Sequence, residues 1–131
     1  MIKIPGRPKG KARPQFANGR AFTPKATRDY EREIGALYQL QDGRMFTGEV
    51  KVEVEAIFKI PSSWSKKKKW ETIDSGKRPE IRPDIDNIVK VVLDGLNGIA
   101  YNDDSQVVEI QARKVYGLDY EGVHINVEAV K

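Results

Sequence analysis

Five aspartates fall within one stretch of the chain, RPDIDNIVKVVLDGLNGIAYNDDSQ, which spans residues 82–106. Asp84 and Asp86 stand at the start of an apolar segment, and Asp103 and Asp104 follow its end. Carboxylates that converge repel one another unless they are protonated or share a cation, and their oxygens suit Mg²⁺ or Mn²⁺. The stretch therefore suggests divalent-metal chemistry, in which the metal activates water and stabilises the charge that develops on phosphate.

Each aspartate also has an ordinary structural explanation. An aspartate at the start of a helix caps the backbone and favours the helix dipole, and Asp86 with Lys90 has the spacing of an exposed i,i+4 pair. The sequence NDDS is common in turns. In the metal interpretation, Lys90 instead adds positive charge at the phosphate or leaving oxygen. Spacing alone leaves open whether the turn returns Asp104 to Asp84 and Asp86.

No other group of residues suggests a catalytic site. The chain has no cysteine, and its one histidine, His124, lies on the polar face of a C-terminal segment, where a surface residue is expected. The chain has no phosphate-binding glycine loop, and DIDNIVK lacks the oxygen ligands and glycine of an EF-hand. The acidic stretch is therefore the candidate site.

The apolar residues of the acidic stretch predict a helix. Positions 85, 88, 89, 92, 93 and 96 repeat with the period of a helix that lies on a sheet, and Asn97 with Gly98 ends it.

Strands are expected before and after this helix. Glu49–Ile60 alternates strictly between apolar and polar residues. Two later strands are expected at Gln106–Tyr116 and Val123–Val130, and the linker GLDYEG has the length and glycines of a hairpin connection. The residues expected to point inward in these two strands are Val108, Ile110, Ala112, Val123, Ile125, Val127 and Ala129.

The N-terminal part of the chain predicts a short strand, a basic loop and a helix. Met1–Ile4 is the expected strand. The segment RPKGKARPQFANGRAFTP is rich in basic residues, proline and glycine, which predicts an irregular, exposed loop. Thr23 and Pro24 are the expected N-cap and first residue of a helix that runs to Leu40.

Positive charge is concentrated in two blocks of a chain whose net charge is +4. Residues 1–32 hold nine Lys or Arg against two acids, and residues 59–82 hold eight against three. The charge balance alone does not identify a partner, but its uneven distribution places basic segments around the acidic stretch.

The second basic block includes WSKKKKWETID, which predicts a short helix capped by Ser62 or Ser63. Its lysines 66–69 are either a solvated helix face, with Trp64 or Trp70 packed inward, or a contact for DNA. The sequence leaves both interpretations open.

The length of 131 residues predicts one domain, 1–131. The expected fold is α/β (α+β-like), a small mixed sheet of about four strands with two to three helices packed on it. The start of the chain lacks the apolar run of a signal peptide, and no segment approaches the roughly 20 apolar residues that cross a membrane. A cytoplasmic protein without membrane contact is expected.

The segment RPDIDNIVKVVLDGLNG, followed by YNDDSQV, resembles the motif of the RusA family of Holliday-junction resolvases, roughly (K/R)PDxDNLxKxxxDxLNG and then DDxQV. The resemblance extends to the N-terminal strand, the basic loop, the TPK helix start and a later strand lysine, Lys114. It implies a homodimeric endonuclease that nicks four-way DNA symmetrically with Mg²⁺, or with Mn²⁺ in its place, and no small-molecule cofactor. It also implies a bacterial or phage-encoded protein of recombination, repair or phage DNA processing.

The resemblance assigns roles by position in the motif. Asn87 and Asp94 match the motif and are interpreted as residues that position the helix. Some family members carry a second basic residue where this chain has Pro83, so a DNA contact there must come from Arg82 or elsewhere. The implied catalytic residues are Asp84, Asp86, Asp104 and Lys90, of which the three aspartates are the metal ligands, with Asp103 as an adjacent acid that can assist.

The resemblance also gives the basic residues an expected role as phosphate contacts. A long basic loop contributes little to the stability of a fold, which favours this role. Phe16 and Phe22 within the loop would either stack at the junction centre or anchor the loop to the core. The residues expected to bind DNA are Arg7, Lys9, Lys11, Arg13, Arg20, Lys66, Lys67, Lys68, Lys69, Arg82 and Lys114.

Two alternative functions are a non-catalytic protein that binds branched DNA, and a nuclease that acts on forks, flaps or nucleotides. The first would gain nothing from carboxylates that face phosphates. Comparing the cleavage of four-way, forked and linear DNA separates the three.

Overall fold

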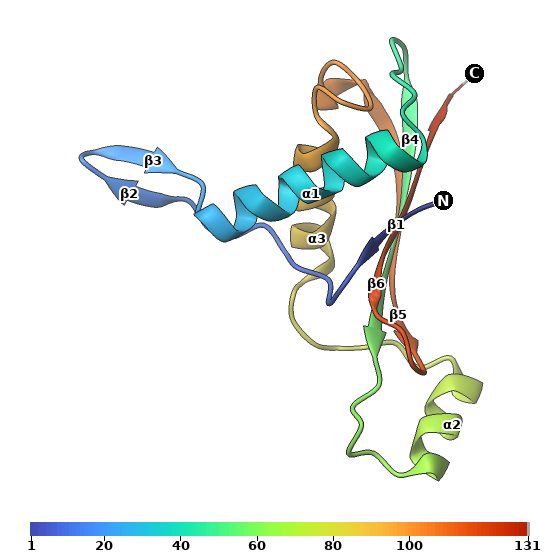
Figure 1. Cartoon of the computed structure of the whole chain (residues 1–131). Coiled ribbons are helices and arrows are strands. Elements are labelled where there is room, and N and C mark those ends of the chain that lie inside the picture. Colours follow the sequence, from blue (N-terminus) through green and yellow to red (C-terminus); the bar gives the residue numbers. More distant parts are fainter. Residues whose placement is uncertain (131) are drawn as a thin grey trace.

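A four-stranded sheet with helices on one face forms the body of the protein (Figure 1). The computed structural model describes residues 1–130. The strand order is β1–β6–β4–β5, and the predicted α/β fold with a mixed sheet is confirmed. The elements are β1 Ile2–Pro5, β2 Gln15–Ala17, β3 Arg20–Phe22, α1 Lys25–Gln41, β4 Val50–Lys59, α2 Lys66–Ser75, α3 Ile85–Leu96, a 3-10 turn at Asp104–Gln106, β5 Val107–Gly117 and β6 Gly122–Ala129.

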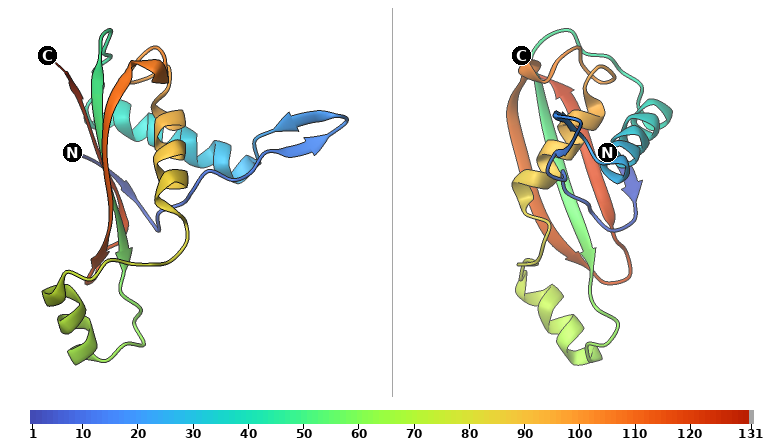
Figure 2. Two further views of the ribbon diagram at one scale, coloured as in Figure 1. Left: turned by 180° about the vertical axis from the view of Figure 1, so that it is seen from behind. Right: turned by 90° about the vertical axis from the view of Figure 1, so that its left-hand side faces the viewer.

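β4 lies inside the sheet and pairs on both sides, in parallel with β5 and antiparallel with β6. Its apolar residues alternate with polar ones, and Val52, Val54 and Phe58 are buried on the side of the helices. The chain must return from the end of β4 to the start of β5, because parallel strands need a crossover connection. α3 makes most of this return, so it begins near the ends of these strands and finishes near their starts (Figure 2).

The expected hairpin between the last two strands is wrong. β5 and β6 follow one another in the sequence, but β4 lies between them. A buried strand must satisfy its backbone N–H and C=O groups on both sides, and β5 and β6 together do this for β4. The linker at 118–121 therefore passes across the end of β4, and β5 is left at an edge of the sheet.

Three residues expected to point inward are exposed. Ile110, opposite Val52, lies on the side of the helices, yet it is 45% exposed because β5 is the edge strand. Val108 is 53% exposed and lies where the β4–β5 register shifts. Ala129 is exposed at the last position of β6. The remaining inward residues of β6, Val123, Ile125 and Val127, are buried as expected.

α1 and α3 cross at two glycines. A Cβ built on Gly95 would come within 2.9 Å of the Ile34 Cβ, and one built on Gly35 would come within 3.0 Å of the Gly95 carbonyl oxygen. The two backbones therefore approach more closely than larger residues would permit. This contact fixes α3 against α1 and so fixes the position of the acidic stretch.

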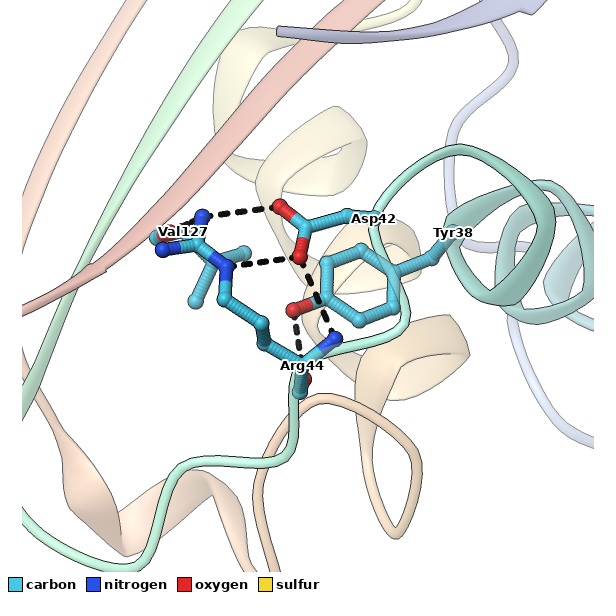
Figure 3. A network of polar contacts seen from close by, with 4 residues as sticks. All are labelled: Tyr38, Asp42, Arg44 and Val127. Atoms are coloured by element: carbon cyan, nitrogen blue, oxygen red, sulfur yellow. Dashed lines mark hydrogen bonds and ion pairs between the residues drawn. The ribbon is translucent and has the colours of Figure 1, made fainter.

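The end of α1 is fastened to the sheet by Arg44 (Figure 3). Its guanidinium donates to both Asp42 carboxylate oxygens, at 2.7 and 2.9 Å, and to the Val127 carbonyl of β6 at 3.4 Å. The Tyr38 hydroxyl donates to the Arg44 carbonyl at 2.6 Å. The charge of Arg44 and its hydrogen bonds lower the pKa of Asp42.

The segment from Gln15 to Phe22 was expected to be irregular, but it forms the hairpin β2–β3, which projects from the body as an arm (Figure 2). Asn18 and Gly19 form the turn, with positive φ values of 52° and 75°. Both central residues of a type I′ turn require positive φ, and Asn-Gly is the dipeptide most suited to it. The flanking QFA and RAF are too short to show the alternation of a strand.

Two helix starts differ from the expected positions. Pro24 is the N-cap of α1, so the helix begins one residue later, at Lys25. α2 begins at Lys66 because the hydroxyl of Ser65, not of Ser62 or Ser63, accepts the Lys68 N–H at 3.1 Å. Residues 61–64 form a separate turn, closed by the Trp64 N–H on the Pro61 carbonyl at 3.1 Å.

In the part of the chain that the structure describes, none of the helices combines the length and apolar character needed to cross a membrane.

Replacement of Gly95 by alanine should lower the free energy of unfolding by about 1–2 kcal/mol, because overpacking against Ile34 outweighs the gain in helix propensity. Urea unfolding followed by circular dichroism measures the change. Gly48→Ala is the control, since no atom lies within 4 Å of a Cβ built there. Equal stability of the two variants would contradict the close crossing of α1 and α3.

Candidate nuclease site

Asp84 and Asp86 present free carboxylate oxygens at the start of α3. Asp84 is the N-cap residue but makes no side-chain hydrogen bond to the helix. Asp86 accepts the Asn87 N–H on Oδ1 at 2.9 Å, which leaves its second oxygen available. Both residues are exposed. The pair therefore offers oxygens to solvent or to a ligand, and the capping explanation accounts for neither side chain fully.

The basic loop that follows β1 lies against this pair. The Lys11 N–H donates to the Asn87 carbonyl at 3.0 Å, and a Cβ built on Gly10 would come within 2.9 Å of the Pro83 Cβ. Glycine at position 10 thus permits the close approach. A hollow of about 310 Å³ lies between loop and helix and is lined by Gly10, Lys11, Arg82, Pro83, Asp84 and Asn87.

Lys11 fastens the loop to both helices. Its Nζ lies 2.6 Å from Glu31 Oε2 of α1 and 3.0 Å from Asp94 Oδ2 of α3, and the three side chains are only 17–22% exposed. Burial lowers the pKa of Lys11, but the hydrogen bonds and charges of Glu31 and Asp94 outweigh it and leave the pKa raised. Asp94 thus positions the loop, and Lys11 is engaged within the protein.

Lys90 lies one helical turn beyond Asp86 on the solvent side of α3. Its Nζ is 3.7 Å from Asp94 Oδ2, and its side chain is 62% exposed. A lysine this exposed moves freely. It can therefore reach a phosphate that lies beside Asp86 without breaking a buried contact.

Asp103 and Asp104 differ in their surroundings. The Asp103 carboxylate accepts the Ser105 N–H at 3.1 Å, and the Gln106 side chain accepts the Asp103 N–H in return, which completes a capping box. The hydrogen bonds from Ser105 lower the pKa of Asp103. Asp104 is exposed and makes no side-chain hydrogen bond or ion pair with the described residues. Asp103 has a structural task, whereas Asp104 is free to bind a ligand.

Within one chain, Asp104 lies far from Asp84 and Asp86. Asp104 begins the 3-10 turn that leads into the start of β5. The segment before Asp84 lies near the other end of β5, where the Ile81 carbonyl accepts a hydrogen bond from the Lys114 ammonium. The 12 residues of α3 span about 18 Å. Among residues 1–130, no three His, Cys, Asp or Glu side chains come together as a metal site. A single chain therefore brings together Asp84, Asp86 and Lys90, but not Asp104.

Most of the basic residues expected to bind DNA fall into three groups. Arg7 and Lys9 lie near the acidic pair, each stacked on an aromatic ring of the core, Phe58 and Tyr30, at 5.3 Å. Arg13 and Arg20 lie on or beside the arm. Lysines 66–69 form the first turn of α2.

Lys11, Lys114 and Lys68 have further internal contacts. Lys11 binds Glu31 and Asp94, as described above. Lys114 donates to the Ile81 carbonyl beneath the start of α3, and Lys68 stacks on the Trp64 ring at 4.0 Å. Trp64 packs against Tyr116 at 5.8 Å, whereas Trp70 is 49% exposed. Among the described residues no such contact is made by the exposed side chains of Arg13, Arg20, Lys66 and Arg82 or by the half-buried Lys69, all of which therefore stay available.

Two features of the site escaped the sequence analysis. The arm was missed, although Asn18-Gly19 is a strong hairpin signal. Glu31 was missed as a partner of Lys11, because no sequence spacing relates a loop residue to a helix 20 residues away. His124 lies on the polar face as expected but is half-buried beside Tyr120, and burial lowers its pKa.

Replacement of Lys11 by glutamine should lower the free energy of unfolding at pH 7 by about 1–3 kcal/mol, because Glu31 and Asp94 lose their shared donor. The pKa of Lys11 is raised above its ordinary value of 10.5, so its stabilising effect is complete below that value and is lost as the pH rises through the folded pKa. The difference between wild type and variant should therefore shrink in urea unfolding above pH 10.5.

Lys25→Gln is the matched control, because the Lys25–Asp29 pair is exposed and a change there should have little effect. A difference for Lys11→Gln that stays constant up to pH 12 would contradict the role of its charge.

The sequence of the chain is similar to those of known proteins. The chain is 39% identical over 116 residues to the uncharacterized protein YqaN of Bacillus subtilis (strain 168), a match that covers 85% of this chain and 79% of that protein. The model of the family described as endodeoxyribonuclease RusA matches residues 5–128. This match includes the arm, α3 with its aspartates, β4, β5 and all but the last residue of β6. The chain belongs to the RusA family of endodeoxyribonucleases.

Proposed function

We propose that this protein is a divalent-metal-dependent endonuclease that cuts four-way DNA junctions as a homodimer. The observation that carries the proposal is the free carboxylate pair of Asp84 and Asp86 among basic residues, in a chain of an endodeoxyribonuclease family. A DNA-binding protein without catalysis would gain nothing from exposed carboxylates that face phosphates.

The donor set suits a hard cation such as Mg²⁺, or Mn²⁺ in its place, since it consists of carboxylate oxygens only. Asp84 and Asp86 would hold the ion from one chain. When bound, such an ion supplies Lewis acidity toward the phosphate and the attacking water. Mg²⁺ is commonly held by one or two carboxylates together with waters and substrate phosphates. The third carboxylate of the motif, Asp104, lies at the far end of α3 in the same chain.

A second copy of the chain can supply this third carboxylate. We therefore place Asp104 in trans, so that each site combines Asp84 and Asp86 of one chain with Asp104 of the partner subunit. A dimer with two-fold symmetry has two such sites, which matches the two equivalent phosphates of a four-way junction. Each chain alone would then bind the cation weakly, and dimerisation would be required for cleavage.

The chain's own residues position the phosphate. Arg82 lies in the hollow beside Asp84, and Lys9 lies on the loop above it, so both attract the DNA backbone to the carboxylate pair. Lys90, one turn along α3, would neutralise charge on the leaving oxygen. The proposed biological setting is recombination, repair or phage DNA processing, in which four-way junctions arise.

Replacement of Asp86 by asparagine should leave binding to a synthetic four-way junction nearly unchanged and reduce nicking by at least a hundredfold, because a carboxylate ligand becomes a neutral amide. The assay maps the nicks on end-labelled four-way junctions in the presence of Mg²⁺ or Mn²⁺. Forked and linear DNA are tested in parallel as comparison substrates. Asp104→Asn should have the same effect. Asp103→Asn is the control, and it should cut DNA at a rate within a few-fold of the wild type, because its carboxylate caps a turn.

Mixing the two inactive variants tests the placement in trans. A heterodimer of Asp86→Asn and Asp104→Asn chains has one intact site and one doubly altered site, so single nicks should return to at most half of the wild-type rate. If both ligands came from one chain, no site would be intact and the mixture would stay inactive. Full nicking by Asp86→Asn alone would reject the site itself.

The arm is proposed to contact the junction. Phe16 is 77% exposed near its tip and is not among the hydrophobic side chains packed in or against the core. Phe16→Ser should weaken junction binding about tenfold, the scale of one lost base–aromatic contact, without a change in stability. Leu40→Ser is the matched control, since Leu40 is 82% exposed on α1. Fluorescence anisotropy at fixed salt measures the junction affinity of both variants. Equal affinities of Phe16→Ser and Leu40→Ser would reject the contact.

A further inference from the structure

The first turn of α1 presents backbone N–H groups that have no acceptor among the described residues. Pro24, the N-cap residue, makes no side-chain cap, and no acidic residue stands in the first turn. The first hydrogen bond of the helix runs from the Arg28 N–H to the Pro24 carbonyl at 3.1 Å, so the N–H groups of residues 25–27 precede it. A helix start of this kind favours an anion, because its free N–H groups and the helix dipole both attract negative charge.

A hollow of about 180 Å³, the α1 hollow, lies beside this turn and is lined by Lys9, Gly10, Ala26, Thr27 and Tyr30. It is formed where the chain passes the start of α1 on its way from β1 to the arm (Figure 1). Its volume is that of about six liquid waters, which gives room for a phosphate group.

The hydroxyl of Thr27 opens into the α1 hollow without a partner. Thr27 is only 6% exposed, and within residues 1–130 its hydroxyl makes no hydrogen bond. An enclosed hydroxyl without a partner would be an unsatisfied buried group, yet His124 Nε2 is the one such side-chain atom among the described residues. The hydroxyl therefore belongs to the small exposed part of Thr27, which lines the hollow. In contrast, the buried Thr72 donates to the Lys68 carbonyl at 2.8 Å.

Lys9 adds a positive charge at the rim of the α1 hollow. Its Nζ lies 5.3 Å from the centroid of the Tyr30 ring, and it makes no ion pair with the described residues. The nearby acids of α1 lie outside the lining, and they are Asp29, Glu31 and Glu33. The first two of these acids are held in ion pairs with lysines. An anion in the hollow would therefore meet a free ammonium and no carboxylate in the wall.

We propose that the α1 hollow binds a phosphate of the DNA backbone through the N–H groups of Ala26 and Thr27, the Thr27 hydroxyl and the Lys9 ammonium. The anion site follows from the protein alone, whereas a DNA phosphate as its ligand rests on the proposed nuclease function. Gly10 lines this hollow and also the hollow beside Asp84. One loop residue thus separates the phosphate at α1 from the carboxylate pair, so the site fixes which phosphate of the strand lies at Asp84.

The chemistry of the wall selects a phosphate. The polar groups that face the hollow are donors, and a phosphate offers them acceptor oxygens in several directions, whereas a carboxylate offers two oxygens in one plane. Backbone N–H groups at a helix start cannot move away as an exposed lysine can. Contacts of this kind fix the register of a protein on DNA, while mobile basic side chains mainly attract it.

Titration with inorganic phosphate, at constant ionic strength and without DNA or metal, tests the anion site. The amide NMR signals of Ala26 and Thr27 should shift saturably in the wild type. Ala26→Asp should raise the dissociation constant for phosphate at least tenfold without loss of stability, because a carboxylate in the first turn favours the helix dipole but repels the anion. Ala36→Asp is the matched control, since Ala36 is also exposed on α1 but lies about 15 Å further along the helix.

Thr27→Val tests the hydroxyl. The variant should bind phosphate about three- to tenfold more weakly, the scale of one hydrogen bond, and should unfold at the same urea concentration as the wild type, because the hydroxyl has no partner in the protein. Thr72→Val should do the reverse. It removes an internal hydrogen bond, so it should lower the stability and leave phosphate binding unchanged.

Methylphosphonates, which replace single backbone phosphates by a neutral group, test the ligand on a four-way junction. One position near the branch point should weaken binding of the wild type and have no effect on Ala26→Asp, which has already lost this contact. Phosphate binding at Ala26 and Thr27 without such a position would overturn the DNA backbone as the ligand.

The outcomes separate this inference from the proposed function. A wild type whose Ala26 and Thr27 signals do not saturate with phosphate, or an Ala26→Asp chain with the wild-type dissociation constant, would overturn the anion site even if the protein cuts junctions. Conversely, phosphate binding that Ala26→Asp removes, in a protein that cuts no DNA with Mg²⁺ or Mn²⁺, would retain the anion site and reject the nuclease.

Discussion

The parallel pairing of β4 with β5 governs where the acidic residues can act. A parallel connection has to cross the sheet, and α3 makes that crossing over 12 residues. The aspartates before α3 and those after it are neighbours in the sequence but belong to opposite ends of the sheet. The glycine contact between α1 and α3 then fixes this helix in place. Every chemical role of the acidic stretch depends on this one feature of the topology.

Much of the fold was predictable, because the signals involved are local. The alternation of β4 and the 3.6-residue period of α3 each identify an element without reference to the rest of the chain. The neighbours of β5 were not predictable, since strand order depends on which edges remain free after the crossover. Val108 and Ile110 show the consequence, because their pattern is that of an inward face while their place at an edge leaves them exposed.

The candidate site was predictable as a set of residue types but not as an arrangement. The motif singled out Asp84, Asp86 and Lys90, and in the structure the two aspartates stand at the start of α3 with Lys90 one turn beyond Asp86. It could not separate Asp103 from Asp104, because the capping box depends on the backbone of Asp103–Gln106. Nor could it show that Lys11 is engaged with Glu31 and Asp94, since charge counted along a sequence does not distinguish a paired lysine from a free one.

The ion pairs of Lys11 also determine how the arm can move. Lys11 precedes β2 by only four residues, so the base of the arm is held at two helices by a lysine that cannot leave without exposing two carboxylates to each other. The tip at Asn18 and Gly19 has no comparable attachment among residues 1–130. Stiffness therefore decreases along the arm from base to tip. An extension of this kind can adapt its tip to branched partners of different shape while its base keeps a constant position beside Asp84.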